Sequence, residues 1–141
     1  MIEMKILYIA IIFTFLSSYL AASTKYFNEG VILFNKDELD KAKFKFEQDI
    51  VHNPKSEQSY LYLSKIFNKQ KKIDLEKKNL NTVILLNPLN EEATFYLAKL
   101  RLRESDFEGS KKLIDQLISF CDKYCEKNKE IKIEVEKSLK K

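Results

Sequence analysis

The sequence has few of the residues that interrupt helices, and few of those on which enzymes rely for catalysis. Its 141 residues include two glycines, two prolines, one histidine and no tryptophan. Because glycine and proline are rare, helices joined by short turns are favoured. Gly30 and Gly109 alone cannot build a glycine-rich phosphate-binding loop. His52 has no second histidine beside it, so we predict neither a metal site nor a catalytic triad. We therefore expect a protein without enzymatic activity and without a cofactor.

The charged residues show no strong excess of either sign. The chain has 25 basic and 21 acidic residues, which give a net charge of +4. A nucleic-acid-binding protein normally shows a larger and more clustered excess of lysine and arginine, so we predict no nucleic-acid partner. Nor does the sequence indicate a small-molecule substrate. A hydrophobic fraction of 45% is enough for the core of one small domain.

The N-terminal residues 1–23 have the pattern of a targeting segment. Lys5 precedes an apolar run over residues 6–16, and small residues including Ala21 and Ser23 follow. This order is typical of a secretory signal peptide cleaved before Thr24. A retained membrane anchor is the main alternative, although residues 6–22 are at the short limit for a span of about 30 Å. A buried helix is a third interpretation. Either main interpretation places the protein outside the cytoplasm, in the periplasm or associated with the membrane of the cell envelope.

A 34-residue repeat is the strongest pattern in the rest of the chain. Asn53-Pro54 and Asn87-Pro88 are 88 − 54 = 34 residues apart. On this period the chain divides into units 23–56, 57–90 and 91–124, with Asp122 in the third proline place. The eighth place of each unit is small, and the tenth and twenty-fourth places are apolar in every unit. These residues are Gly30, Ser64 and Ala98, then Ile32, Ile66 and Leu100, then Phe46, Leu80 and Ile114. A period of 34 is typical of helix-turn-helix repeats.

The repeats resemble the tetratricopeptide repeat (TPR) family over nearly all of the chain after residue 23. The first unit supplies most of the family pattern, with Tyr26, Gly30, Leu33, Ala42, Phe46 and Pro54. The resemblance implies an all-α fold with three TPR units over residues 24–124 in a short right-handed solenoid. Residues 125–141 follow as a capping helix, since Ile131, Val135 and Leu139 form a single apolar stripe among charged residues.

Some positions depart from the family pattern. Glu76 occupies a helix-crossing place where the first unit has Ala42. A buried unpaired carboxylate is costly, so we expect Glu76 to reach solvent or a lysine, or else to displace its helix.

Helix-capping residues are predicted at several boundaries. Ser105 and Glu108 form a capping-box pattern, and Asp37, Ser56 and Asn90 are suitable N-caps. Lys72 is a poor N-cap.

The resemblance also implies a partner-binding groove lined by the first helix of each unit. The residues in the groove places are Phe27, Val31, Phe34, Leu61, Tyr62, Lys65, Lys69, Phe95, Tyr96, Lys99 and Arg103. Such a groove would suit a peptide or protein segment with apolar anchors and some acidic residues. Two alternatives stay open. The apolar members could instead pack neighbouring helices together, and the basic members could form a solvated face.

One type of TPR partner is excluded by the resemblance. Chaperone-binding members hold a C-terminal carboxylate with lysine, asparagine and arginine side chains. The matching places here hold Phe27, Val31, Tyr62, Glu92 and Tyr96. None of these residues can form that clamp.

The two cysteines, Cys121 and Cys125, are four residues apart near the end of the third unit. Outside the cytoplasm they are candidates for a disulfide. The spacing strains such a bond on a continuous helix, although a helix that ends near Tyr124 would relieve the strain. A disulfide and a pair of reduced, partly buried thiols both remain open.

These observations favour a non-enzymatic interaction scaffold that binds a peptide or protein of the bacterial cell envelope. The alternative is a membrane-tethered structural subunit that docks through its convex face or its tail helix. A binder of anionic polymer or lipid ranks last, because the acidic residues are mixed so evenly with the basic ones.

The intact mass of the protein from its native source tests the N-terminal prediction. Cleavage before Thr24 removes residues 1–23, and the measured mass should be lower by the mass of that segment. A mass that includes residues 1–23 would contradict a cleaved signal and fit the tethered subunit.

Overall fold

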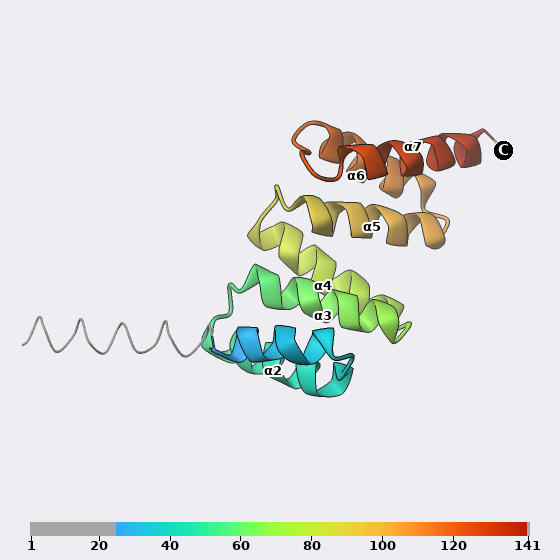
Figure 1. Ribbon diagram of the computed structural model, residues 1–141. Helices are drawn as coiled ribbons and strands as arrows, with labels where there is room; N and C mark the ends of the chain where they lie inside the picture. Colours follow the sequence, from blue (N-terminus) through green and yellow to red (C-terminus); the bar gives the residue numbers. More distant parts are fainter. Residues whose placement is uncertain (1–24, 141) are drawn as a thin grey trace, which may run out of the picture. The chain divides into compact units, whose positions relative to one another are not determined.

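The computed structural model describes residues 25–140, and the predicted signal or anchor over residues 1–23 lies outside them. All regular structure in the described residues is helical (Figure 1), so the all-α prediction is confirmed. A helix over residues 25–35 comes first. It is followed by α2 (Leu39–His52), α3 (Glu57–Lys69), α4 (Ile73–Leu86), α5 (Glu91–Arg103), α6 (Phe107–Ile118) and α7 (Cys125–Leu139). The chain forms two compact units, which meet in sequence between Ser59 and Tyr60. No helix within residues 25–140 is both long and apolar enough to cross a membrane.

The helix starts keep the 34-residue period. The helices α3, α5 and α7 begin at Glu57, Glu91 and Cys125, and both steps are 34 residues (91 − 57 and 125 − 91). The helices α2, α4 and α6 begin at Leu39, Ile73 and Phe107, again in steps of 34 residues. The tail helix α7 therefore starts in phase with the first helix of a further unit.

The helix α7 differs from α5, which is buried on two opposite sides, with Leu100 in the cluster that contains Leu80 and Ala98 in the cluster that contains Ile114. Ala98 and Leu100 of α5 are fully buried, whereas the matching places of α7 hold the charged residues Lys132 and Glu134. Its buried side chains lie on one side only, at Asn128, Ile131 and Val135. A helix with one packed side and one charged side is suited to end a stack of repeats.

The turn between the two helices of each unit contains a residue in the left-handed region. Asp37, Lys71 and Ser105 have φ angles of 59°, 57° and 62°. In the second unit, Lys71 N–H donates to Asn68 O at 3.0 Å and Lys72 N–H to Phe67 O at 2.9 Å. This pair of bonds is the Schellman motif that ends a helix, and the other two turns repeat it. The motif normally uses glycine, and none of the three turns has one.

These turns correct two of the predicted caps. Because Ser105 lies in the turn, α6 starts one residue later than the capping-box pattern requires. Its N-cap is Asp106, whose Oδ1 accepts from Gly109 N–H at 2.9 Å. Asp37 likewise belongs to a turn, and α2 follows Glu38, which makes no side-chain cap bond.

The structure also describes the positions of the remaining predicted caps. Asn90 is confirmed, since its Oδ1 accepts from Ala93 N–H at 2.9 Å. Lys72 precedes α4 without a side-chain cap bond, as expected of a poor cap. Ser56 precedes α3, and its hydroxyl donates to Ser59 Oγ at 3.1 Å.

Four repeated places are buried in all three units, the eighth, twentieth, twenty-fourth and twenty-seventh. The residues there are Gly30, Ser64 and Ala98, then Ala42, Glu76 and Ser110, then Phe46, Leu80 and Ile114, then Asp49, Val83 and Leu117. The Ser110 hydroxyl donates to Ala98 O at 2.9 Å, which joins α6 to α5 at their crossing. The tenth place is less uniform, because Ile66 and Leu100 are buried but Ile32 is exposed.

Gly30 allows a close contact with Phe46 of α2. A Cβ atom at this position would lie 2.7 Å from Phe46 Cε1, which is closer than van der Waals contact permits. Phe46 is fully buried, so its ring has little freedom to move away.

We expect Gly30→Ala to destabilise the protein by about 1–3 kcal/mol, because the added methyl group overpacks the contact with Phe46. Replacing glycine by alanine within a helix usually increases stability by up to ~1 kcal/mol, so the effect expected here has the opposite sign. Ser64→Ala, at the same repeat place, is the control and should change stability by less than about 1 kcal/mol. Urea denaturation followed by circular dichroism measures both, and a stabilised Gly30→Ala variant would contradict the packing.

A second prediction concerns the left-handed turns. Lys71→Gly should stabilise the protein by about 1 kcal/mol, since glycine adopts φ near +60° without the penalty of a side chain. Lys78→Gly, at an exposed position inside α4, is the matched control and should destabilise by about 1 kcal/mol. Equal effects at the two lysines would contradict the turn geometry.

Candidate partner-binding face

The predicted groove residues are divided between the two compact units. Phe27, Val31 and Phe34 lie on the helix over residues 25–35, and the Phe27 ring packs 5.8 Å from the ring of Phe46. The other eight lie on α3 and α5, within the compact unit that begins at Tyr60: Leu61, Tyr62, Lys65, Lys69, Phe95, Tyr96, Lys99 and Arg103. These eight, with their neighbours, are the candidate site described below.

The apolar members of this set are mostly buried. Leu61 is 8% exposed and lies in a core cluster with Leu80 and Leu97. Phe95 is 7% exposed and lies in a second cluster with Ile114 and Ile131. For these two residues the structure favours packing between helices over direct contact with a partner. Tyr62 and Tyr96 are partly exposed, and each can offer part of a ring at the surface.

Arg103 partners the buried carboxylate of Glu76. Its Nη2 lies 3.0 Å from Glu76 Oε1 and 2.9 Å from Oε2, and Asn68 Nδ2 donates to Oε1 at 2.9 Å. Glu76 is only 3% exposed, and α4 keeps its place in the 34-residue period. The prediction that Glu76 reaches solvent or a lysine is therefore wrong. An arginine of the following repeat and an asparagine satisfy the carboxylate instead.

A second ion pair occupies the face between α3 and α5. Lys65 Nζ lies 2.8 Å from Glu92 Oε1, and both side chains are mostly buried. The same ammonium group sits 4.7 Å from the centre of the Tyr62 ring. Glu92 also acts on the phenol of Tyr124, the residue that precedes α7. Burial, and next the charge of Glu92, raise the pKa of Tyr124 well above its usual range, so its phenol stays protonated.

Three aromatic rings meet beside this pair. The Phe95 ring lies 5.5 Å from that of Tyr96 and 5.1 Å from that of Tyr124. Lys99 Nζ is 5.9 Å from the centre of the Phe95 ring, and Lys127 Nζ is 5.1 Å from that of Tyr124. Contacts of this kind hold lysine stems flat against aromatic faces and leave their charge at the surface.

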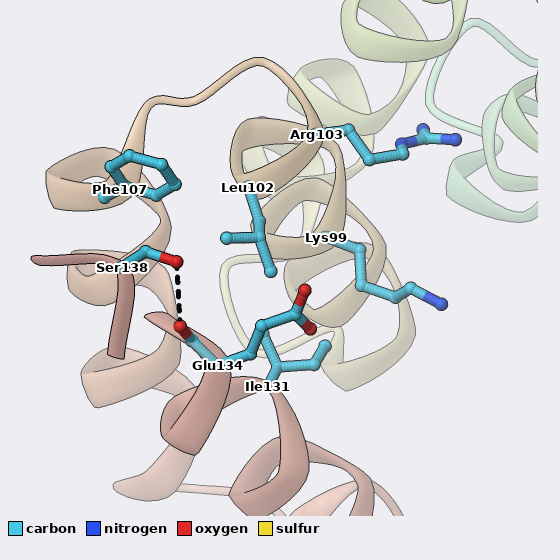
Figure 2. Close-up of a pocket in the computed structure, with 7 residues that line it drawn as sticks. All are labelled: Lys99, Leu102, Arg103, Phe107, Ile131, Glu134 and Ser138. Carbon is cyan, nitrogen blue, oxygen red and sulfur yellow. Dashed lines mark hydrogen bonds between the residues drawn. The ribbon is translucent and has the colours of Figure 1, made fainter. Parts of the chain in front are cut away.

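The helix α7 closes this face and forms two hollows with α5. The larger, of about 410 Å³, is lined by Phe95, Tyr96, Lys99, Lys127, Glu130, Ile131 and Glu134. The smaller, of about 240 Å³, lies beside it, and Figure 2 shows Lys99 and Leu102 of α5 on one side and Ile131 and Glu134 of α7 on the other. Both hollows are open and carry charges of both signs. We use the name first-helix face for one surface of α3 and α5. It consists of Tyr62, Lys65, Tyr96, Lys99 and the larger hollow.

Sequence reasoning missed the contributions of Tyr124 and α7 to this face. Tyr124 falls in the thirty-fourth place, where the earlier units have the small polar residues Ser56 and Asn90. An aromatic residue in a helix-cap place was the available signal. The in-phase start of α7, at Cys125, was the second.

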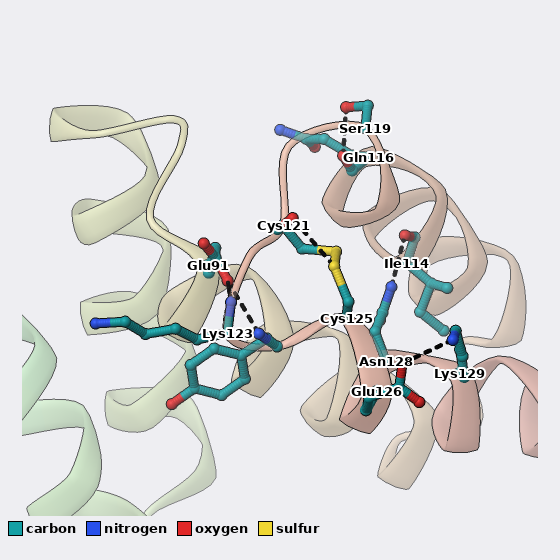
Figure 3. Close-up of a disulfide and its surroundings, with 11 residues drawn as sticks. Glu91, Ile114, Gln116, Ser119, Cys121, Lys123, Cys125, Glu126, Asn128 and Lys129 are labelled. Atoms are coloured by element: carbon teal, nitrogen blue, oxygen red, sulfur yellow. Dashed lines mark hydrogen bonds and ion pairs between the residues drawn. A yellow bond between two sulfur atoms is a disulfide. The ribbon is translucent and has the colours of Figure 1, made fainter.

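The turn that leads into α7 is fixed at two points (Figure 3). Cys121 and Cys125 are joined by a disulfide, with their Cα atoms 5.4 Å apart. The Glu91 carboxylate accepts from the backbone N–H groups of Lys123 at 2.9 Å and Tyr124 at 3.0 Å. Desolvation acts to raise the pKa of Glu91, but the backbone N–H donors of residues 122–124 outweigh it and lower this pKa.

Within the residues that the structure describes, no side chains are arranged as a metal-binding site. No group of three or more histidine, cysteine, aspartate or glutamate side chains is placed to hold an ion there. His52 is exposed, and its ring stacks 5.2 Å from that of Tyr26.

The sequence matches no family model and no curated protein sequence. Its structure is similar to solved TPR domains. The first TPR of Spaghetti (RPAP3), bound to the HSP90 peptide SRMEEVD, aligns with a TM-score of 0.76 and 13% identity over 84% of this chain and 94% of that chain. The Arabidopsis OM64 TPR domain aligns with a TM-score of 0.75 and 13% identity, over 84% and 98%. The TPR2B domain of yeast Sti1, in a pHsp70 complex, aligns with a TM-score of 0.74 and 12% identity, over 82% and 96%. At such identities the likeness shows the fold, and the chain has the TPR fold.

We expect Arg103→Ala to destabilise the protein by about 2 kcal/mol, because it removes the charged partner of the buried Glu76 carboxylate. Glu76→Ala/Arg103→Ala should be more stable than Arg103→Ala alone, since alanine occupies this place in the first unit. Lys111→Ala is the control, as it breaks an exposed pair with Asp115 and should cost less than about 1 kcal/mol. Additive effects of the two substitutions in chemical denaturation would show that the pair is not coupled.

Proposed function

We propose that this protein is an exported, non-enzymatic scaffold whose first-helix face binds a segment of another protein of the bacterial cell envelope. The observation that carries the proposal is the repeated pairing of a partly exposed tyrosine with a lysine three residues later. Tyr62 and Lys65 form the pair on α3, and Tyr96 and Lys99 form it on α5. Rigid aromatic rings beside cationic groups are typical anchors for a bound peptide.

The solved neighbours support a peptide as the partner. The Spaghetti domain is bound to the HSP90 peptide SRMEEVD, and the Sti1 domain was solved as a complex with pHsp70. Two TPR domains of similar fold are therefore seen in complex with a partner. In the present chain the same type of scaffold would present tyrosine rings.

The charges on the first-helix face indicate that the bound peptide is not an acidic C-terminal segment. Lys65 is already paired with Glu92, and Arg103 is paired with Glu76. Glu92 brings a negative charge to one of the places where chaperone-binding TPR domains hold a carboxylate. The partner we propose is consequently anchored by apolar or aromatic side chains, with Lys99 as an exposed cation at the edge.

The alternative is a membrane-tethered structural subunit that docks through its convex face, taken as the side of the second helices α2, α4 and α6, or through its tail helix. Exposed apolar side chains on the second helices favour this alternative, with Phe44 57% exposed on α2 and Leu85 82% exposed on α4. A third candidate function, the binding of an anionic polymer or lipid, has less support. Two of the cations predicted to bind such a ligand, Lys65 and Arg103, are already paired with carboxylates.

A matched pair of double variants distinguishes the two functions. The partner is first identified by cross-linking in the native cell envelope, and its affinity is then measured by isothermal titration calorimetry. Tyr62→Ala/Tyr96→Ala should weaken binding by at least about tenfold, because it removes both aromatic anchors. Phe44→Ala/Leu85→Ala should leave the affinity unchanged. The reverse pattern would contradict the proposal and support docking through the second helices.

A further inference from the structure

The Cys121–Cys125 disulfide has no role in the proposed scaffold function, yet it lies next to the first-helix face. Cys121 follows α6 after a short turn, and Cys125 is the first residue of α7. Both cysteine residues are partly exposed. Between them lie three residues, and the last of these is Tyr124.

Tyr124 carries the connection from the disulfide to the face. Its ring packs on Phe95, and its phenol is subject to the charge of Glu92. Glu92 in turn holds Lys65 on α3. A short series of interactions therefore joins the disulfide turn to both tyrosine-bearing helices of the face.

The disulfide also belongs to the packed part of this region. Phe120, Cys121 and Tyr124 all pack against the core cluster that contains Phe95, Ile114 and Ile131. The disulfide closes a loop of only a few residues, so it removes little entropy from the unfolded chain compared with a long loop. For this reason we expect the disulfide to act mainly on the turn and on Tyr124. Its effect on the stability of the repeats as a whole should be smaller.

We propose that the Cys121–Cys125 disulfide is a redox-modifiable latch, which in its oxidised form holds Tyr124 against Phe95. Reduction frees the turn and lets Tyr124 leave the aromatic cluster. The structural part of this proposal stands by itself. Only its consequence, a change in partner binding, rests on the proposed function of the first-helix face.

The redox step is ordinary thiol–disulfide exchange with a small dithiol. One thiolate of the dithiol attacks a cysteine sulfur, the S–S bond breaks, and the other cysteine leaves as a thiolate that takes up a proton. The second thiol of the reagent then displaces the first cysteine. The protein disulfide gains two electrons and two protons and becomes two thiols, while the reagent is oxidised to its own disulfide.

Hydrogen exchange on the full chain, oxidised and then reduced with dithiothreitol, tests the latch. The N–H groups of Lys123 and Tyr124, which donate to Glu91, should exchange at least about tenfold faster after reduction. The amides of α3 and of the middle of α5 should exchange at unchanged rates. Cys121→Ser/Cys125→Ser should behave like the reduced protein whether or not dithiothreitol is present.

An optical readout follows the Tyr124 ring itself. The difference between the wild-type protein and Tyr124→Phe in alkaline absorbance titration isolates the phenol of Tyr124. In the oxidised protein its ionisation should lie beyond that of an ordinary tyrosine, and reduction should move it back towards the ordinary range.

Two outcomes would overturn the proposal. Unchanged exchange at Lys123 and Tyr124 would show that Glu91 and packing hold the turn without the disulfide. Faster exchange throughout α3–α6 would show that the bond stabilises the whole unit and is not a local latch. Neither readout uses a partner, so a failure here is distinct from a failure of the Tyr62→Ala/Tyr96→Ala binding test.

Discussion

Close contact between the two helices of each repeat is the constraint on which the rest of the structure depends. The eighth, twentieth and twenty-fourth places are buried in every unit, and a large side chain at the eighth place would force the helices apart. Gly30 shows the limit of this constraint, since its neighbour Phe46 leaves no room for a methyl group. Once this contact is fixed, the sixth and ninth places of α3 and α5 stay partly or fully exposed. The positions of Tyr62 and Tyr96 on the face follow from it.

The sequence was sufficient to predict the all-α fold, the 34-residue period and the helix-turn-helix units, because these depend on spacing and on small and apolar residues. It was less informative where local signals compete. Ser105 and Glu108 match a capping box, but the chain needs a left-handed residue to leave α5, and Ser105 fills that role. The helix therefore starts one residue later, with Asp106 as its cap.

The site was harder to predict than the fold, because its polar contacts join residues from different repeats. Glu76 and Arg103 are 27 residues apart, and nothing in the sequence around Glu76 points to an arginine of the next unit. Lys65 and Glu92 are likewise partners across a repeat boundary. Once these pairs are known, the face has a different character from the one that residue types alone suggest. Two of its expected cations are neutralised by carboxylates, and the partly exposed tyrosine rings become its most distinctive groups.

Site-specific photo-cross-linking to the partner tests this account most directly. A photoreactive amino acid is placed in the full chain at Tyr96 on α5 or, in a separate variant, at the exposed Leu85 on α4. Binding through the first-helix face predicts that the partner is captured from position 96 and not from position 85. Capture from position 85 alone would contradict the account and place the partner on the second helices.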